Sequence, residues 1–136
     1  MLRSDEIGFS YVADGASRAG APVNRMFGAE TVHAGSGAVV FTRGELDVAS
    51  APELLRRLLA LLSLPIDSLG LDLAELEFID STGIEALDRA RMSAGEKGVT
   101  FTLSSVPDQA RRILAIADML ARFDLRDVPL VPQGFD

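Results

Sequence analysis

The stretch that most restricts the fold of this chain is the junction between an apolar, strand-like run and a helix-like run. Residues 69–79 are rich in apolar side chains, and a helical pattern begins near Gly83. Asp80, Ser81 and Thr82 lie between the two runs. The start of a helix carries free backbone N–H groups and the positive end of the helix dipole, so it favours negative charge. A phosphoryl group on Ser81 would therefore be favoured electrostatically by the helix start. It would also change the charge of any surface that a partner binds.

Strand and helix patterns alternate along the rest of the chain. The expected strands are residues 30–33, 38–43, 69–73 and 99–103, and the expected helices are residues 48–62, residues 83–96, one that opens at Pro107, and a short one at residues 118–122. Ser50 is the expected N-cap of the first helix. Because crossover helices place successive strands parallel, the order predicts an α/β fold with a mixed, mainly parallel sheet of four to five strands and about four helices.

The two ends of the chain differ in composition from this central region. Residues 1–29 are expected to form an N-terminal extension that is partly flexible, because residues 14–22 are small, polar and rich in Gly and Ala. Within the extension, residues 7–12 alternate apolar and small side chains and favour a short edge strand. We expect the compact domain to span residues 30–128 and a tail to follow at residues 129–136. The extension could also serve self-association, so a homodimer stays open.

Bulk composition restricts the class of protein. A length of 136 residues suits one domain with its own core, and the absence of cysteine excludes disulfides and thiol chemistry. The net charge of −7 argues against nucleic acid as the main partner, because phosphate contacts need clustered basic residues. No run approaches the roughly 18 apolar residues of a membrane span, and no signal peptide is evident at the start. We therefore expect a cytoplasmic protein with no membrane partner and no cofactor.

A second polar turn is expected at a similar place in the sheet. Residues 44–47, Gly-Glu-Leu-Asp, lie between a predicted strand and a predicted helix. Taken alone, each turn has a purely structural explanation, with Gly44 for backbone freedom, Asp47 near a helix start, and Glu85 as the acid of a capping box after residues 80–83. The ends of parallel strands meet at one edge of a sheet, so the two turns together can form one functional surface.

Together these motifs resemble the STAS domain of bacterial anti-sigma factor antagonists. The resemblance rests on residues 44–47, Gly-Glu-Leu-Asp, and residues 78–84, Phe-Ile-Asp-Ser-Thr-Gly-Ile. Residues 97–103, followed by Pro107 and residues 111–114, are similar to a strand and a helix of the same family. The chain departs from the family pattern at Glu85, where small or apolar residues are usual, and at Ala117-Asp118, where Gly-Leu is frequent.

The resemblance implies a partner-switching regulator and not a catalyst. In that family, the first hydroxyl after the Asp is phosphorylated by a partner that is both anti-sigma factor and serine kinase. The corresponding residue here is Ser81, and Thr82 is the less favoured neighbour. The unphosphorylated antagonist binds the anti-sigma factor and frees the sigma factor, and phosphorylation prevents that binding. The implied partner-binding residues are Glu45, Asp47, Asp80, Ser81, Thr82, Gly83 and Glu85.

Two other classes of function remain as alternatives. The first is a STAS scaffold or ligand-sensing module that has no phosphorylation switch. The second is an enzyme, either a receiver-like phosphoacceptor built on Asp72, Asp80 and Lys97, or a hydrolase with His33 as the base for Ser81. We expect neither enzyme, because Lys97 falls at a helix end and no Gly-x-Ser-x-Gly nucleophile elbow is present.

Overall fold

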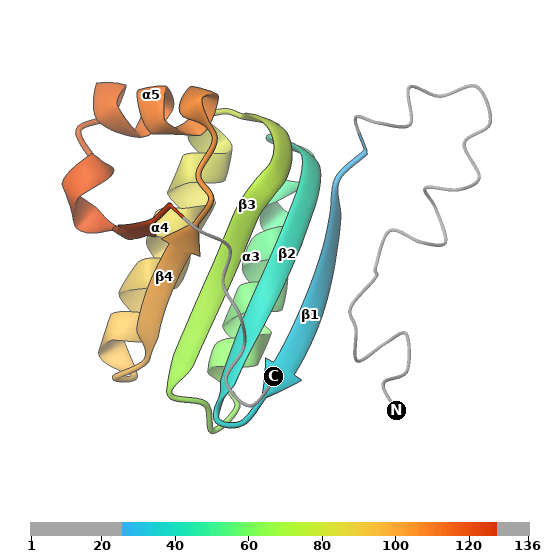
Figure 1. The fold of residues 1–136 in the computed structure, drawn as a ribbon, viewed down its shortest axis with the longest axis vertical. Helices are drawn as coiled ribbons and strands as arrows, with labels where there is room; N and C mark the ends of the chain where they lie inside the picture. Colours follow the sequence, from blue (N-terminus) through green and yellow to red (C-terminus); the bar gives the residue numbers. More distant parts are fainter. Residues whose placement is uncertain (1–25, 128–136) are drawn as a thin grey trace.

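The computed structural model describes residues 26–127, and its five strands lie side by side in the order of the chain (Figure 1). β1 pairs antiparallel with β2, and all later neighbours are parallel. In chain order, the elements are β1 (Gly28–Ala34), β2 (Gly37–Leu46), α3 (Ala51–Leu62), β3 (Ser68–Ile79), α4 (Ser81–Glu96), β4 (Thr100–Ser104), α5 (Asp108–Ile116), the 3₁₀ helix η2 (Leu120–Arg122) and β5 (Asp124–Arg126). The predicted α/β class and the mainly parallel sheet are confirmed.

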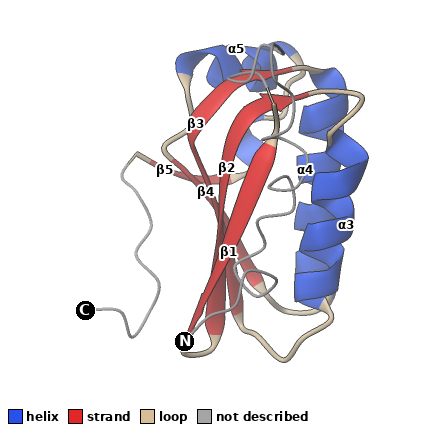
Figure 2. Ribbon diagram, turned by 90° about the vertical axis from the view of Figure 1, so that its right-hand side faces the viewer, coloured by secondary structure: helices blue, strands red, loops and turns tan. Residues whose placement is uncertain are grey.

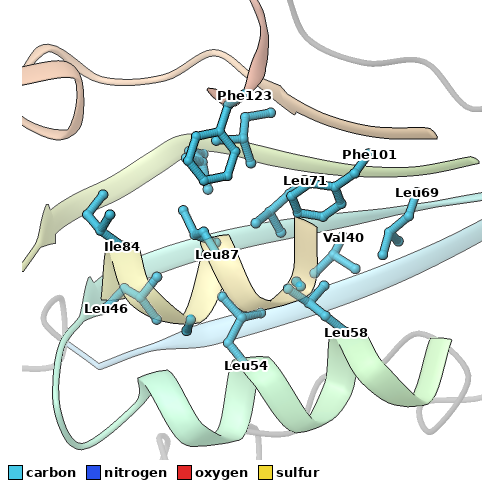
Figure 3. Packing of buried hydrophobic residues seen from close by; sticks show 14 of the residues in the cluster. Val40, Leu46, Leu54, Leu58, Leu69, Leu71, Ile84, Leu87, Phe101 and Phe123 are labelled. Atoms are coloured by element: carbon cyan, nitrogen blue, oxygen red, sulfur yellow. The ribbon is translucent and has the colours of Figure 1, made fainter. Parts of the chain in front are cut away.

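The core lies between the sheet and the helices α3 and α4, which cover the same face (Figure 2). Leu54 and Leu58 of α3 and Leu87 of α4 are completely buried, and they meet side chains of the central strands (Figure 3). Full burial of a leucine side chain contributes about 1.5–3 kcal/mol to folding. The helical periodicity of both segments is thus explained by contact with one face of the sheet.

Both central strands are longer than predicted, and both bend. β3 continues to Ile79, and its pairing with β2 shifts register between Phe41 and Arg43 and again between Gly44 and Glu45. Gly44 has a φ of 86° and lies inside β2, so its predicted role in a turn is wrong. A Cβ atom at this position would collide with the backbone of Met26. Glycine therefore serves a β-bulge here and not a loop.

The described residues contain three α-helices and one 3₁₀ helix, so the prediction of about four helices is slightly too high. The difference lies at the end of α5. Asp118 adopts a left-handed conformation with a φ of 61°, and the Met119 N–H donates to the Leu114 carbonyl at 2.8 Å. This pattern terminates an α-helix, so only one 3₁₀ turn follows where a fourth helix was predicted.

Three predictions fall wholly or mostly on residues that the structure does not describe. They are the partly flexible extension at residues 1–29, of which only residues 26–29 are described, the strand at residues 7–12, and the tail at residues 129–136. The short strand β5 was not predicted, because its three residues include Asp124 and Arg126 and show no apolar alternation. None of the described helices is long and apolar enough to cross a membrane.

Candidate functional site

Asp80 is the N-cap of α4 and organises the junction with β3. Its backbone is extended, and its Oδ1 atom accepts hydrogen bonds from the N–H groups of Thr82 at 2.9 Å and Gly83 at 3.1 Å. The Asp80 carbonyl accepts from the Ile84 N–H at 3.0 Å. Two of the N–H groups expected to be free, those of Thr82 and Gly83, are therefore already bonded, and the Ile84 bond is the first within the helix. The predicted capping box is also absent, because Glu85 lies five positions after the cap.

The two hydroxyl groups at this junction differ in their surroundings. The half-buried Thr82 donates its hydroxyl to Asp80 Oδ1 at 2.5 Å. Ser81 is exposed, and its hydroxyl forms no hydrogen bond to any other described residue. Of the two, Ser81 presents the hydroxyl that an outside group can reach without breaking an internal bond.

The structure brings the two predicted turns together. At the ends of the parallel strands β2 and β3, Leu46 pairs with Ile79 and Glu45 pairs with Phe78. The Asp80 N–H donates to the Leu46 carbonyl at 3.2 Å and extends this pairing into the junction. The carboxyl ends of β2 and β3 thus form one edge, as predicted for parallel strands.

Gly83 makes this close arrangement possible. A Cβ atom at Gly83 would lie 2.7 Å from Ile79 Cγ1 and 2.8 Å from the Leu46 carbonyl oxygen. Such short separations would force the helix and the strands apart. Gly83 therefore allows the first turn of α4 to contact the end of β2, and its place in the site is structural.

The turn between β2 and α3 uses a different set of hydrogen bonds. Asp47 Oδ1 accepts from the N–H groups of Ala49 at 3.0 Å and Ser50 at 3.2 Å. Ser50 occupies the predicted N-cap position, but its hydroxyl makes no capping bond to α3. It donates instead to the Glu45 carbonyl at 2.8 Å and accepts from the Asp47 N–H at 3.0 Å. Asp47 and Ser50 therefore hold the end of β2.

Two apolar side chains at this edge were not predicted as part of the site. Val48 is 71% exposed and Phe78 is 39% exposed, although most large apolar side chains of the described residues are buried. Phe78 lies opposite Glu45 and close in sequence to Ser81, and Val48 follows Asp47 directly. Protein-binding surfaces contain exposed apolar side chains bordered by polar ones, and single exposed apolar residues also occur elsewhere on this domain, as at Met92 and Ile116. The exposure of Val48 and Phe78 could be inferred only once the face of each strand end was known.

Sequence reasoning also missed Gln109, which lies in the first turn of α5. Its side-chain amide accepts from the Ile79 N–H at 3.0 Å and donates to the Ile79 carbonyl at 2.9 Å. The two residues are 30 positions apart, and no local motif marks the contact.

The residues considered for catalysis, His33, Asp72 and Lys97, do not gather around Ser81. His33 pairs with Ala38, eight positions before Leu46 in β2, which places it about 26 Å from the junction. Lys97 caps the opposite end of α4 from Ser81. Asp72 is buried in β3, where its carboxylate accepts from Ser104 Oγ at 3.1 Å and the Ala74 N–H at 2.9 Å. Neither proposed catalytic set is assembled by the described residues, which also contain no cluster of metal-ligating side chains.

A cavity of about 330 Å³ lies away from the junction, where β1, β2 and β3 run side by side. Its lining includes Phe41, Arg43, Asp72 and Glu75. Its lining residues are both apolar and charged, and small-molecule sites commonly combine apolar walls with a few polar groups.

Comparison with known proteins identifies the family. The STAS domain model matches residues 29–129, and the chain therefore belongs to the STAS domain family. The predicted resemblance is confirmed at this level. No curated protein matches the sequence.

Solved structures give the same fold. The chain is similar to an anti-sigma factor antagonist from Mycobacterium paratuberculosis, with 23% identity over 79% of this chain and 90% of that one and a TM-score of 0.70. It is also similar to the Bacillus cell fate determinant SpoIIAA in its phosphorylated form, with 15% identity over 76% and 92% of the two chains and a TM-score of 0.60. SLC26A9 matches over 64% of this chain and 17% of its own, with 16% identity and a TM-score of 0.58. At these identities, the likenesses establish the fold alone.

Proposed function

We propose that this protein is an anti-sigma factor antagonist that works by partner switching. In this proposal it is a non-catalytic cytoplasmic regulator of transcription, and it binds an anti-sigma factor with serine kinase activity while Ser81 is unphosphorylated. Phosphorylation of Ser81 releases the partner. The observation that carries the proposal is the exposed Ser81 hydroxyl, which has no bond to another described residue, whereas the neighbouring Thr82 hydroxyl is bonded to Asp80. The phosphorylated form of the structurally similar SpoIIAA supports it.

Electrostatics at the junction support a strong response to phosphate. Phosphoserine carries roughly −1.5 to −2 charge near neutral pH. The N–H groups of Thr82 and Gly83 already bond to the Asp80 carboxylate, so they are not free to neutralise a phosphate. Burial of an uncompensated charge in a protein interface costs several kcal/mol. A loss of about 3 kcal/mol lowers affinity more than a hundredfold, so phosphorylation needs no refolding to release the partner.

The surface around Ser81 also indicates the chemistry of its partner. The proposed contact residues include the acidic side chains of Glu45, Asp47 and Glu85, and Val48 and Phe78 add exposed apolar area. We expect the partner to present basic side chains around an apolar centre. Charge complementarity of this kind raises the association rate and weakens with added salt.

Binding of purified protein to the host's anti-sigma factors, before and after phosphorylation, tests the proposal. We expect one partner to bind the unphosphorylated protein, to add a single phosphate to Ser81, and then to lose more than a hundredfold in affinity. Ser81→Ala should bind without becoming phosphorylated, and Ser81→Asp should bind weakly. Ser63→Asp is the matched charge control, because Ser63 is exposed and follows α3, about 18 Å along that helix from its start at the site. Equal binding by Ser81→Asp and Ser81→Ala would contradict the switch.

The second candidate is a ligand-sensing STAS module without a switch, and the cavity beside β1, β2 and β3 favours it. A small molecule that binds there would raise the thermal unfolding temperature of the wild-type protein by mass action. Ala74→Leu places extra side-chain volume at the cavity lining and should remove that increase. A ligand effect that survives in Ala74→Leu would argue against this cavity as the binding site.

A further inference from the structure

β3 extends well beyond its neighbour β4. The two strands pair only from Ser68 opposite Thr100 to Asp72 opposite Ser104. β2, on the other side, pairs with β3 as far as Ile79. Among the described strands, the last part of β3 is therefore paired on one side only. Its free backbone groups need another partner, because buried N–H and carbonyl groups are costly to leave unbonded.

Gln109 provides that partner at Ile79. Its amide oxygen accepts from the Ile79 N–H at 3.0 Å, and its amide nitrogen donates to the Ile79 carbonyl at 2.9 Å. A side-chain amide that bonds both groups of one residue reproduces the hydrogen bonds of an adjacent strand. α5 itself is fixed on the core by the buried side chains of Ala110 and Leu114. Gln109 therefore continues the sheet by one residue at the position before Asp80.

The peptide unit that joins Ile79 to Asp80 is consequently held at both ends. Its carbonyl oxygen accepts from Gln109, and its N–H donates to the Leu46 carbonyl at 3.2 Å. This peptide leads directly into the Asp80 cap and Ser81. Rotation of the unit would break a bond to α5 on one side and a bond to β2 on the other.

We propose that Gln109 is a positioning residue for Ser81, which makes recognition of Ser81 depend on α5. Gln109 fixes the Ile79–Asp80 peptide, the peptide fixes the Asp80 carboxylate over the first turn of α4, and the turn sets the direction of the Ser81 hydroxyl. The recognition part of this inference rests on the proposed partner-switching function. The ordering part concerns the isolated protein alone.

Amide hydrogen exchange in the isolated protein tests the ordering part. Gln109→Leu keeps a similar side-chain size and removes both hydrogen bonds, and Gln109→Glu keeps an acceptor for the Ile79 N–H but loses the donor to its carbonyl. We expect exchange at the Ile79, Thr82 and Gly83 amides to rise about tenfold in Gln109→Leu, with a smaller rise at Ile79 in Gln109→Glu. Thr102→Val is the matched control, because it removes one side-chain bond, to Asp124 at 3.2 Å, between β4 and β5. It should leave these three amides unchanged.

Affinity for the anti-sigma partner tests the recognition part. We expect Gln109→Leu to bind the partner about tenfold more weakly and Thr102→Val to bind like the wild type. Unchanged exchange in both Gln109 variants would overturn the proposal, whether or not a partner is found. Raised exchange with unchanged affinity would overturn the dependence of recognition on α5, and the proposed function would stand. A wild-type protein that binds no anti-sigma factor would overturn the proposed function and the recognition part together, and the exchange result would still decide the ordering part.

Discussion

The two strand-to-helix junctions of this domain contain the same residue types but use them differently. At the β2–α3 junction, Ser50 is 8% exposed, and its hydroxyl bonds to the Glu45 carbonyl and the Asp47 N–H. At the β3–α4 junction, Ser81 is exposed and its hydroxyl bonds to no other described residue. Both junctions contain an aspartate that accepts two backbone N–H groups.

The difference arises from the order of Asp and Ser along the chain. Ser50 follows Asp47 by three positions, so its hydroxyl can reach the Asp47 N–H and the Glu45 carbonyl across the turn. Ser81 directly follows Asp80 and occupies the first helical position, where it is exposed and its hydroxyl bonds to no other described residue. One junction is therefore a closed structural turn, and the other leaves a hydroxyl on the surface. At these junctions, the serine open to modification is the one whose hydroxyl is not held by backbone groups of the preceding strand and turn.

The largest change in the free energy of unfolding is expected when a side chain is added at Gly83, inside the β3–α4 junction. Gly83→Ala would bring a Cβ atom within 2.7 Å of Ile79 Cγ1, so we expect it to lower the free energy of unfolding by about 2–3 kcal/mol. Gly95→Ala is the matched control in the same helix, because no atom lies within 4 Å of its Cβ position. That change should stabilise the protein by up to about 1 kcal/mol. Urea unfolding measures both, and equal effects would contradict the close contact at Gly83.

The second largest loss of stability is expected at the two aspartates, and it should be greater at Asp80 than at Asp47. Asp80→Ala removes the cap from two N–H groups and from the Thr82 hydroxyl, and we expect a loss of about 1–2 kcal/mol. Asp47→Ala should cost about 1 kcal/mol, because its bonds lie in a turn before α3. Asp80→Asn should recover most of the loss, since Asn is an equally good N-cap. Thermal unfolding checks the series, and a greater loss in Asp47→Ala would reverse the ranking.

The smallest effects compare the two serines directly. Ser50→Ala should lower the free energy of unfolding by about 1 kcal/mol, because it leaves the Glu45 carbonyl and the Asp47 N–H without their partner. Ser81→Ala should change it by less than about 0.5 kcal/mol. The same denaturation measurement suffices for both variants. A loss in Ser81→Ala as large as that in Ser50→Ala would mean that the Ser81 hydroxyl is structural.

Much of the fold could be predicted from local patterns. Apolar periodicity located α3 and α4, and alternation located the central strands, because each of these segments packs one side against the core. The strand-to-helix junction at Asp80 was predicted for the same reason. The end of β2 was not, because Gly44 and the adjacent bulges interrupt the alternation that marks a strand.

The remaining errors concern contacts between distant parts of the chain. Gln109 bonds to Ile79 across 30 positions, and nothing in the neighbourhood of either residue indicates the pairing. The direction of the Ser50 hydroxyl was also beyond local reasoning, because an N-cap position does not determine whether the side chain faces the helix or the preceding strand. Residues 44–47 and 80–83 were correctly expected to meet, since the edge of a parallel sheet requires it.

The strands follow one another across the sheet in the order of synthesis. Each strand from β2 onward therefore finds its neighbour already made. The parallel pairs nevertheless join residues far apart in the sequence, such as Gly37 and Ser68, and parallel pairing of this kind is intrinsically slow. The junction at Ser81 is an exception to this order of synthesis, because the side chain that completes the pairing of Ile79 comes later, in α5. Because a domain generally folds as a unit, this surface is complete only after α5 has been synthesised. A partner that depends on the finished surface would then select chains whose synthesis has passed α5.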